Sequence, residues 1–505
     1  MIDLTTPLDI VRKSFNGSSC RDDRALIGQF LTPAKIARFM ASLFHEDIKH
    51  VRMLDAGAGA GSLFAACVET FIARKRRPLS ISIVSYENDQ SILPFLKETM
   101  EHCELRCREA GITFHGEIRQ EEFIAAAAVQ SENRLFDDQH ERFTHAILNP
   151  PYKKIHGQST TRRLLDKTGI EVSNLYSAFV WLAARLLEPG GELVAITPRS
   201  FCNGPYFRRF RIAMLDMMSL QRIHVFESRK KAFGDDDVLQ ENIIYHMIKG
   251  GRKPERLILS SSDGVDFEKL RSRRVPYALV VSPSDRDSFV HLALNDADDS
   301  IMERVEVFSS SLAKLGLDVS TGRVVDFRAH EFLRSLPEDG AVPLIYPCHF
   351  ESGFVKWPAE SGKKPNAIVD TPDTRDLLLP SGYYVVTKRF TAKEEKRRVV
   401  AAIYDPRKIK APFLGFENHL NYFHAKGNGL SGSMARGLAL YLNSSLFDQH
   451  FRLFSGHTQV NATDLRKMRY PSREQLLRLG AHVKHQMPDQ ATVDTILEKE
   501  AVIEG

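Results

Sequence analysis

The feature that most constrains the fold is a regular alternation of short apolar segments and longer amphipathic segments between about residues 50 and 250. Short apolar runs bounded by turn residues are typical of buried strands, and the longer segments have the periodicity of helices. Strands that alternate with helices predict an α/β fold, a doubly wound, mostly parallel sheet with helices on both faces. The seven expected strands are 51–54, 81–86, 112–115, 146–148, 193–196, 223–226 and 243–248, and the main expected helices are 62–74, 92–109 and 175–187.

Turn residues mark the expected boundaries. Pro189, Gly190 and Gly191 follow the helix at 175–187 and are expected to end it. A chain of 505 residues is too long for one compact domain. Near residues 250–254 the alternation gives way to short strand-like pieces, many turns and clustered basic residues. We therefore predict one domain over 1–252 and a C-terminal α+β region over 253–505.

Composition excludes several classes of protein. No segment is long and apolar enough to span a bilayer, and residues 1–17 lack the apolar core of a secretion signal. The six cysteines have no metal-ligand spacing, so we expect free thiols, no metal site and a cytoplasmic protein. The net charge of +5 is weak evidence for a polyanionic partner.

A glycine-rich turn follows the first expected strand, with the sequence Asp-Ala-Gly-Ala-Gly-Ala-Gly at residues 55–61. Gly57 and Gly59 let the backbone turn sharply and let a ligand approach the main chain. A dinucleotide-binding loop needs another glycine where this chain has Ser62, so that motif does not match. An acid at the strand end suits S-adenosylmethionine, which is positively charged, although a simple tight turn remains possible. Glu87, which ends the second strand, is placed to accept ribose hydroxyls.

The fourth expected strand ends at a rigid corner, Asn149-Pro150-Pro151-Tyr152. An exocyclic amino group has two hydrogens, and two acceptors are needed to hold it. The Asn149 side-chain oxygen and the Pro150 carbonyl supply them, which frees the nitrogen lone pair to attack an electrophilic methyl group. Tyr152 offers a flat face on which a base stacks. The alternative is a rigid turn without chemistry.

Together the two motifs resemble the S-adenosylmethionine-dependent N6-adenine DNA methyltransferases. The order, with the cofactor motif first, the Asn-Pro-Pro-Tyr motif next and a long variable segment last, is similar to the gamma subclass typified by the TaqI enzyme. Residues 28–33, Gly-Gln-Phe-Leu-Thr-Pro, with the helix expected at 34–44, resemble the segment of about 25–45 that covers the cofactor's methionine end. The sequence around the motifs is similar to the PstI/BsuBI modification methylases of bacteria, which act on CTGCAG.

The resemblance implies roles for individual residues. Thr32 and Asp55 would meet the methionine moiety, Glu87 the ribose, and Pro151 would pack near the cofactor's adenine. The family's Asp-Phe pair for the adenine edge is replaced here by Glu122 and Phe123, whose acid is one methylene longer. The cofactor-binding set implied is Thr32, Asp55, Gly57, Gly59, Glu87, Glu122, Phe123, Asn149 and Pro151, and the catalytic set is Asn149, Pro150 and Tyr152.

The implied partner is double-stranded DNA, with residues 1–252 as the catalytic domain and 253–505 as the target-recognition region. A base inside a duplex is out of reach, so the target must be flipped out of the stack. Phe233 is expected to stack on the flipped base opposite Tyr152, with Phe226 as the other candidate. The basic residues expected at DNA phosphates are Lys153, Lys154, Arg162, Lys388, Arg389 and Arg397.

Other functions fit parts of the pattern. Release-factor glutamine methyltransferases share Asn-Pro-Pro-Tyr, but they carry their substrate domain before the glycine loop, whereas here the extra region comes after it. A ribosomal RNA methyltransferase is a weaker rival, and an inactive DNA-binding regulator on this scaffold is a third. The expected protein is a monomeric modification enzyme, with a restriction endonuclease acting separately on the same site.

Overall fold

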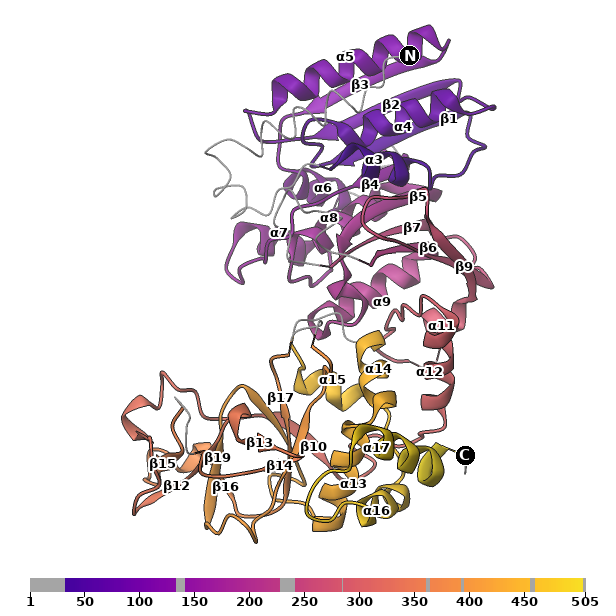
Figure 1. Ribbon diagram of the computed structural model, residues 1–505. Coiled ribbons are helices and arrows are strands. Elements are labelled where there is room, and N and C mark those ends of the chain that lie inside the picture. The colour runs from indigo at the N-terminus through magenta and orange to yellow at the C-terminus, as the bar shows by residue number, and fades with distance from the viewer. Residues whose placement is uncertain are drawn as a thin grey trace. The chain divides into compact units, whose positions relative to one another are not determined.

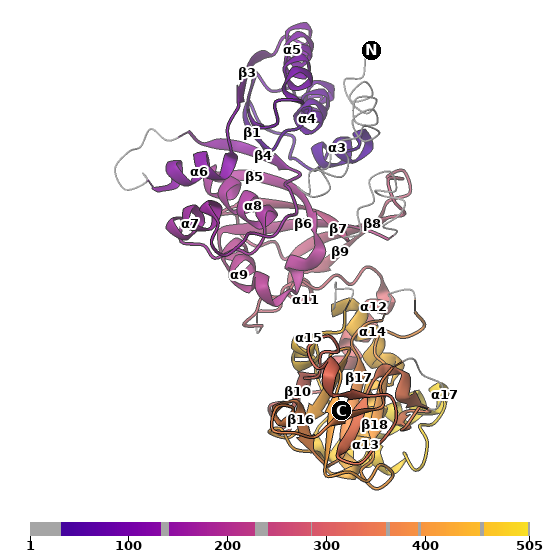
Figure 2. The same ribbon diagram turned by 90° about the vertical axis from the view of Figure 1, so that its left-hand side faces the viewer.

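The protein is described here by a computed structural model, which covers residues 32–132, 141–227, 241–283, 285–359, 364–391, 395–454 and 459–502. The chain forms two compact units, Met1–Leu294 and Asn295–Gly505. Figure 1 and Figure 2 show the elements of each unit, and each is described by itself. No helix within the described ranges is long and apolar enough to cross a membrane.

The first unit is built on a nine-stranded sheet with the order β3-β2-β1-β4-β5-β7-β6-β8-β9. This confirms the α/β prediction, but the predicted count of seven strands is wrong because two more strands continue the sheet. The strands are β1 His50–Ala56, β2 Ser80–Tyr86, β3 Thr113–Arg119, β4 Phe143–Leu148, β5 Leu187–Pro198, β6 Met218–Phe226, β7 Asn242–Lys249, β8 Arg256–Ser262 and β9 Arg271–Pro276.

Strands β3, β2, β1, β4 and β5 are all parallel to their neighbours. Strand β7 is antiparallel to β5 and β6, and β9 is antiparallel to β8. Because the first five strands point the same way, the segments after them all begin at one edge of the sheet. This carboxyl edge is where a ligand binds in open α/β sheets.

Helices cover both faces of the sheet, as a doubly wound fold requires. One buried cluster joins the sheet to the helices that come after β3, β4 and β5, and the other joins it to α3, α4 and α5. The helices are α3 Ala34–Ala41, α4 Ser62–Ala73, α5 Leu93–Glu109, α6 Phe123–Glu132, α7 Thr160–Lys167, α8 Leu175–Leu186, α9 Arg208–Met217 and α11 Tyr277–Val280, with 3-10 turns η2 Arg199–Cys202 and η3 Pro205–Phe207.

The expected helix stop at Pro189, Gly190 and Gly191 lies inside a strand instead. Helix α8 ends at Leu186 and β5 begins at the next residue. The register between β4 and β5 shifts here, since Phe143 pairs with Leu187 whereas His145 pairs with Glu192. Gly190 has a φ of 82°, so it provides the left-handed residue that this irregularity uses.

The boundary expected between residues 252 and 253 lies later, between Leu294 and Asn295. Strand β8 pairs with β6 in parallel, and β9 pairs with β8, so both strands belong to the first sheet. The Gly250-Gly251 turn that suggested the boundary is a connection between β7 and β8. Turn residues alone do not separate a linker from a loop inside a sheet.

The second unit combines a six-stranded and a five-stranded sheet with helices, in agreement with the α+β expectation for the C-terminal region. Helices α13 (Gly432–Leu442) and α16 (Arg473–Ala481) cross closely. A Cβ on Gly437 of α13 would lie only 1.8 Å from the carbonyl oxygen of Leu476 in α16. The strands are β10 Asp318–Thr321, β11 Leu333–Arg334, β12 Ala341–Ile345, β13 Phe350–Glu351, β14 Phe354–Val355, β15 Ala367–Val369, β16 Leu378–Pro380, β17 Tyr384–Lys388, β18 Ala401–Tyr404, β19 Phe413–Phe416 and β20 Leu420–His424. The helices are α12 Asp296–Glu306, α13 Gly432–Leu442, α14 Ser445–Phe454, α15 Ala462–Lys467, α16 Arg473–Ala481 and α17 Gln490–Leu497.

Candidate active site

A cavity of about 260 Å³ opens at the carboxyl edge of the first sheet. It is lined by eight of the residues that the sequence assigned to the cofactor: Thr32, Gly57, Gly59, Glu87, Glu122, Phe123, Asn149 and Pro151. Its further lining residues are Ala58, Ser62, Leu63, Tyr86, Asn88, Glu121, Thr161, Leu175 and Phe179. The segments after β1, β2, β3 and β4 therefore meet around one space.

The glycine loop is folded over the end of β2. The amides of Gly57 and Ala58 both donate to the carbonyl of Tyr86, at 2.9 and 3.0 Å. Gly61 has a φ of 88°, and a Cβ there would lie 2.5 Å from Cζ of Phe64. Glycine is required at this position because a side chain meets both backbone strain and a packed ring.

The carboxylate of Glu87 also holds the glycine loop in place. Its carboxylate accepts the amide of Gly59 at 2.9 Å and those of Asn88 and Asp89 at 2.8 Å each. Burial raises the pKa of Glu87, while these three amides favour the ionised form. A carboxylate has about four acceptor positions, so one remains for a ligand hydroxyl. Glu87 thus both shapes the loop and faces the cavity.

Asp55, at the end of β1, is fully buried and does not line the cavity. Neither carboxyl oxygen has a hydrogen-bond partner among the described residues. Burial raises the pKa of Asp55 to about 8, the charge of Glu87 adds to the shift, and the nearby backbone amide of Phe64 offsets part of it. A buried carboxyl without partners is costly unless a donor or a cation accompanies it. This fits a cationic ligand beside the loop.

The pair Glu122-Phe123 forms another wall of the cavity. The Glu122 carboxylate accepts the amides of Ile124 at 3.1 Å and Ala125 at 2.8 Å, so it caps the start of α6. Phe123 packs against Tyr86 and Phe179, each with ring centroids 5.1 Å apart. The longer acid thus has a local structural role, and the aromatic ring is held in the wall.

At the catalytic corner the side-chain amide of Asn149 is held from both ends. Its Nδ2 donates to the Thr32 hydroxyl at 2.9 Å, and its Oδ1 accepts from the Tyr152 hydroxyl at 3.1 Å. Burial raises the pKa of Tyr152, so its hydroxyl stays protonated and donates. Pro150 is buried, whereas Asn149 and Tyr152 are half-buried. The corner therefore joins the segment before α3 to the end of β4.

Two aromatic residues that the sequence did not single out continue inward from Tyr152. Tyr176 meets Tyr152 edge-on with centroids 6.2 Å apart, and Phe207 stacks on Tyr176 at 5.4 Å. Tyr176 is fully buried and its hydroxyl lies 3.1 Å from Oγ of Ser200. In one sequence such residues cannot be told from ordinary core aromatics.

Phe233 and Phe226 were the two candidates for stacking on a flipped base. Phe233 lies outside the described residues. Phe226 is 7% exposed and packs in the core beside His224 and Phe267, so it is not available to a ligand.

The six residues expected at phosphates fall into separate groups. Lys153 and Lys154 are exposed directly after the catalytic corner. Arg162 instead donates to the carbonyl of Val172 at 2.8 Å and pairs with Asp166 and Glu171. In the second unit Lys388 and Arg389 are half-buried.

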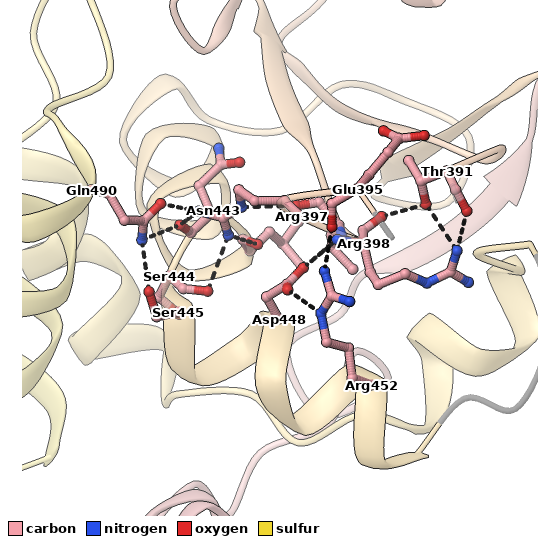
Figure 3. Close-up of polar contacts among 12 residues, drawn as sticks. Thr391, Glu395, Arg397, Arg398, Asn443, Ser444, Ser445, Asp448, Arg452 and Gln490 are labelled. Atoms are coloured by element: carbon pink, nitrogen blue, oxygen red, sulfur yellow. Dashed lines mark hydrogen bonds and ion pairs between the residues drawn. The ribbon is translucent and has the colours of Figure 1, made fainter. Parts of the chain in front are cut away.

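Arg397 stabilises a helix end rather than facing solvent. Its guanidinium donates to the carbonyls of Asn443 and Ser444, just past the end of α13, and to the side chain of Gln490 (Figure 3). Burial lowers the pKa of Arg397. Because carbonyls at a helix C-terminus attract a cation, its position is explained without DNA, and its assignment as a phosphate contact is not supported.

One group within the described ranges has the spacing of cation ligands, namely His45, Glu192 and His246, whose ligand atoms lie within 4.8 Å of one another. Glu192 lies midway along β5, where it pairs with His145 of β4, so the group is away from the carboxyl edge. His246 Nε2 is 2.7 Å and His45 Nδ1 is 3.2 Å from the Glu192 carboxylate, so both histidines contact one buried carboxylate.

Comparisons with known proteins show the family of the chain. Residues 72–233 match the model of the Eco57I restriction-modification methylase family. The chain is 43% identical over 498 residues to the type II methyltransferase M.PstI of Providencia stuartii, covering 99% of this chain and 97% of that protein. It is 45% identical over 482 residues to the type II methyltransferase M.BsuBI of Bacillus subtilis, covering 94% of each.

Among solved structures, the type IIL restriction-modification enzyme MmeI in complex with DNA shares the fold, with a TM-score of 0.54 and 10% identity over 92% of this chain and 72% of that one. The fold is thus that of an S-adenosylmethionine-dependent methyltransferase of a restriction-modification system. More narrowly, the chain belongs to the type II DNA methyltransferases that include M.PstI and M.BsuBI.

Proposed function

We propose that this protein methylates N6 of adenine at a specific site in duplex DNA. The observation that carries the proposal is the amide of Asn149, whose nitrogen faces Thr32 and whose oxygen faces Tyr152 beside the cofactor cavity. This orientation leaves the oxygen to act as an acceptor for an amino group. A cytosine N4 or a glutamine amide has the same two hydrogens, so the choice of adenine rests on the resemblance to the N6-adenine enzymes.

The residues of the corner have distinct tasks. Asn149 Oδ1 and the Pro150 carbonyl accept the two amino hydrogens, which directs the nitrogen lone pair away from the ring. Tyr152 stacks on the base and, through its hydroxyl, holds Asn149 in place. S-adenosylmethionine, when bound, supplies the electrophilic methyl group. Catalysis then rests on positioning and on dipoles fixed before the base arrives.

In this proposal, different residues of the cavity contact different parts of the cofactor. Glu87 accepts a ribose hydroxyl with its remaining acceptor position. Thr32 and Asp55 lie on the methionine side, and Asp55 acts through its charge from behind the glycine loop. Phe123 and Pro151 enclose the adenine ring, and Glu122 keeps one edge of its carboxylate for the adenine amino group while capping α6. Gly57 and Gly59 leave the main chain open to the ligand.

We further propose that the target adenine is flipped out of the duplex and is stacked by Tyr152 and, from outside the described residues, by Phe233. Lys153 and Lys154 contact phosphates beside the flipped base, and Lys388 and Arg389 do so from the second unit, which reads the sequence. The resemblance to the PstI/BsuBI modification methylases leads us to propose a site of the CTGCAG type. The enzyme acts as a monomer and protects DNA from a separate endonuclease.

The direct test is to incubate unmethylated plasmid with the full chain and S-adenosylmethionine and to map modified bases by long-read sequencing. We expect N6-methyladenine at one short sequence. Asn149→Ala should still bind the cofactor but lose methyl transfer, and Asn88→Ala, also at the cavity, serves as the matched control. Normal turnover by Asn149→Ala would refute the catalytic assignment.

The same assay separates the alternatives. Methyl transfer to ribosomal RNA or to a glutamine-containing protein, with none to DNA, would favour those substrates. Sequence-specific DNA binding with no methyl transfer to any of them would indicate a regulator that has kept the scaffold without its chemistry.

A further inference from the structure

The turn after β5 exposes an aromatic side chain at the carboxyl edge of the sheet. Tyr206, in η3, is 82% exposed, the largest fraction among the exposed large hydrophobic side chains of the described residues. Its neighbour Phe207 is 7% exposed and points the other way, into the core. A single exposed apolar residue needs no explanation by itself, so the case rests on how this one is presented.

The turn that carries Tyr206 is held rigidly by a buried arginine. Arg211 has no exposed surface, and its guanidinium donates to the carbonyls of Phe201 at 2.8 Å, Gly204 at 3.1 Å and Asp287 at 2.9 Å. It also lies over the ring of Phe289, 4.6 Å from the centroid. Burying a cation is costly unless its donors are satisfied. The bonds from Nε and Nη1 offset part of that cost and fix a solvent-exposed turn, while Nη2 has no partner among the described residues.

Gly204 makes the same turn tight. Its amide donates to the Ser200 carbonyl at 2.8 Å, and a Cβ on it would lie 2.6 Å from that oxygen. A side chain at this position would push the turn open. Tyr206 is therefore presented on a preformed support and not on a loose loop.

This support is connected to the catalytic corner. Phe207 stacks on Tyr176, which meets Tyr152 edge-on, so three packed rings lead from the base-stacking residue to the neighbour of Tyr206. The next two residues, Arg208 and Arg209, are exposed and paired with Asp287 and Glu171. An exposed ring on a rigid turn, at the edge where the target base enters, suits contact with a flat apolar surface.

We propose that Tyr206 enters the base stack of the duplex at the position that the target adenine vacates and stabilises the flipped state. The proposal rests on the proposed function, because it needs a base that leaves the helix. Flipping costs the stacking and pairing of the target base, and an aromatic ring that stacks on the neighbouring bases offsets part of that cost. Tyr206 is a positioning residue, since it does not touch the reacting atoms.

The test uses the full chain and duplexes carrying the mapped site with 2-aminopurine at the target position, whose fluorescence rises when it leaves the stack. Tyr206→Ala should reduce this rise and slow single-turnover methylation of the normal duplex about ten-fold or more. Tyr206→Trp should keep both near the wild-type values. Leu79→Ala, which removes an exposed side chain just before β2 at the opposite edge, is the matched control.

A second substrate makes the test specific. In a duplex with a mismatch opposite the target adenine, the base is already unpaired, and Tyr206→Ala should methylate it within about two-fold of wild type. Cofactor affinity should not change. Unchanged kinetics on the normal duplex, or an equal loss on both duplexes, would overturn the proposal. A wild-type chain that leaves adenine unmodified would overturn the proposed function itself, which is a separate result.

Discussion

The amide of Asn149 shows how little freedom the reacting corner has. Thr32 accepts from its nitrogen and Tyr152 donates to its oxygen, so the side chain cannot rotate without losing two hydrogen bonds. An acceptor that is already oriented does not have to reorganise during the reaction. Thr32, which the sequence assigned to the cofactor, therefore also orients Asn149, the proposed catalytic residue.

This double role predicts a measurable loss. Thr32→Val removes the acceptor for Asn149 Nδ2 while keeping the shape, and a net hydrogen bond is worth about 1 kcal/mol. We expect the methylation rate at saturating cofactor to fall roughly five- to ten-fold, with Thr32→Ser retaining most of it. Single-turnover kinetics measure the rate, and Thr161→Val at the same cavity is the control. A change in cofactor affinity alone would argue against a role in holding Asn149.

Replacing the buried carboxyl of Asp55 should change the stability of the protein and its affinity for the cofactor in opposite directions. Its pKa is raised to about 8 in the folded chain, against 3.8 ordinarily. The folded state thus disfavours the charge, and stability without cofactor should decrease as pH rises from about 4 to 8. Asp55→Asn has no charge to bury. At pH 8 it should be more stable by on the order of a few kcal/mol, because one pKa unit corresponds to about 1.4 kcal/mol.

Denaturant unfolding at pH 4.5 and 8 measures this difference, which should fall to about 1 kcal/mol at the lower pH because the ordinary pKa of 3.8 lies just below it. Calorimetry should show that the same variant binds S-adenosylmethionine much more weakly. If Asp55→Asn were destabilised equally at both pH values, Asp55 would contribute to packing and not provide a buried charge for a cationic ligand.

At the scale of elements, the buried carboxylate of Glu192 connects the segment after α3 to the sheet. Glu192 is 5% exposed at its side chain, and it contacts His246 and His45. Burial raises the pKa of Glu192, but hydrogen bonds from the two histidines outweigh it and bring the pKa well below the usual range. The contribution of Glu192 to stability is therefore present above about pH 4.5 and is lost as pH falls below it.

Glu192→Gln should lower the unfolding free energy at pH 7 by roughly 1–3 kcal/mol, because buried partners are left poorly satisfied. The variant should also lack the part of the decrease in unfolding free energy that Glu192 causes in the wild type as pH falls below 4.5. His45→Ala, which removes a side chain that is 61% exposed, should cost much less. Equal costs for the two substitutions, measured by urea unfolding, would contradict the ranking.

The sequence predicted the elements that carry a strong pattern. Strands β1 to β7 were expected because each has a core of apolar residues, and the residues around the cavity were expected because cofactor and base chemistry restricts the residue types at the strand ends. Strand β8 was missed because it follows the Gly250-Gly251 turn that suggested a domain boundary. Strand β9 was missed because Arg271, Arg273 and Arg274 make it look like a polar loop. Arg397 was misassigned because a basic cluster does not reveal which of its members faces α13. Tyr176 and Arg211 were missed because their roles depend on being buried, and the sequence alone does not show which side chains the packing buries.

On the scale of the whole molecule, the chain has two compact units with separate cores. The cofactor cavity lies wholly within the first unit. A ligand that binds the folded state of one unit stabilises that unit by mass action, by about 2.7 kcal/mol at one hundred times its dissociation constant.

Scanning calorimetry of the full chain should therefore show two transitions. We expect S-adenosylmethionine to raise one of them by several degrees and to leave the other unchanged, while duplex DNA with the mapped site raises both. Asp55→Asn should abolish the first shift and provides the control. A single transition that moves as a whole would show that the units unfold together.

Strands β8 and β9 have a practical consequence for recombining relatives. A hybrid that exchanges C-terminal parts at residue 252 would replace the outer two strands of a sheet with foreign ones, and any mismatch would leave the edge of β6 unpaired, which invites aggregation. A junction between Leu294 and Asn295 leaves the sheet intact. If the second unit reads the DNA sequence as proposed, new specificities should be obtained by grafting at that later point.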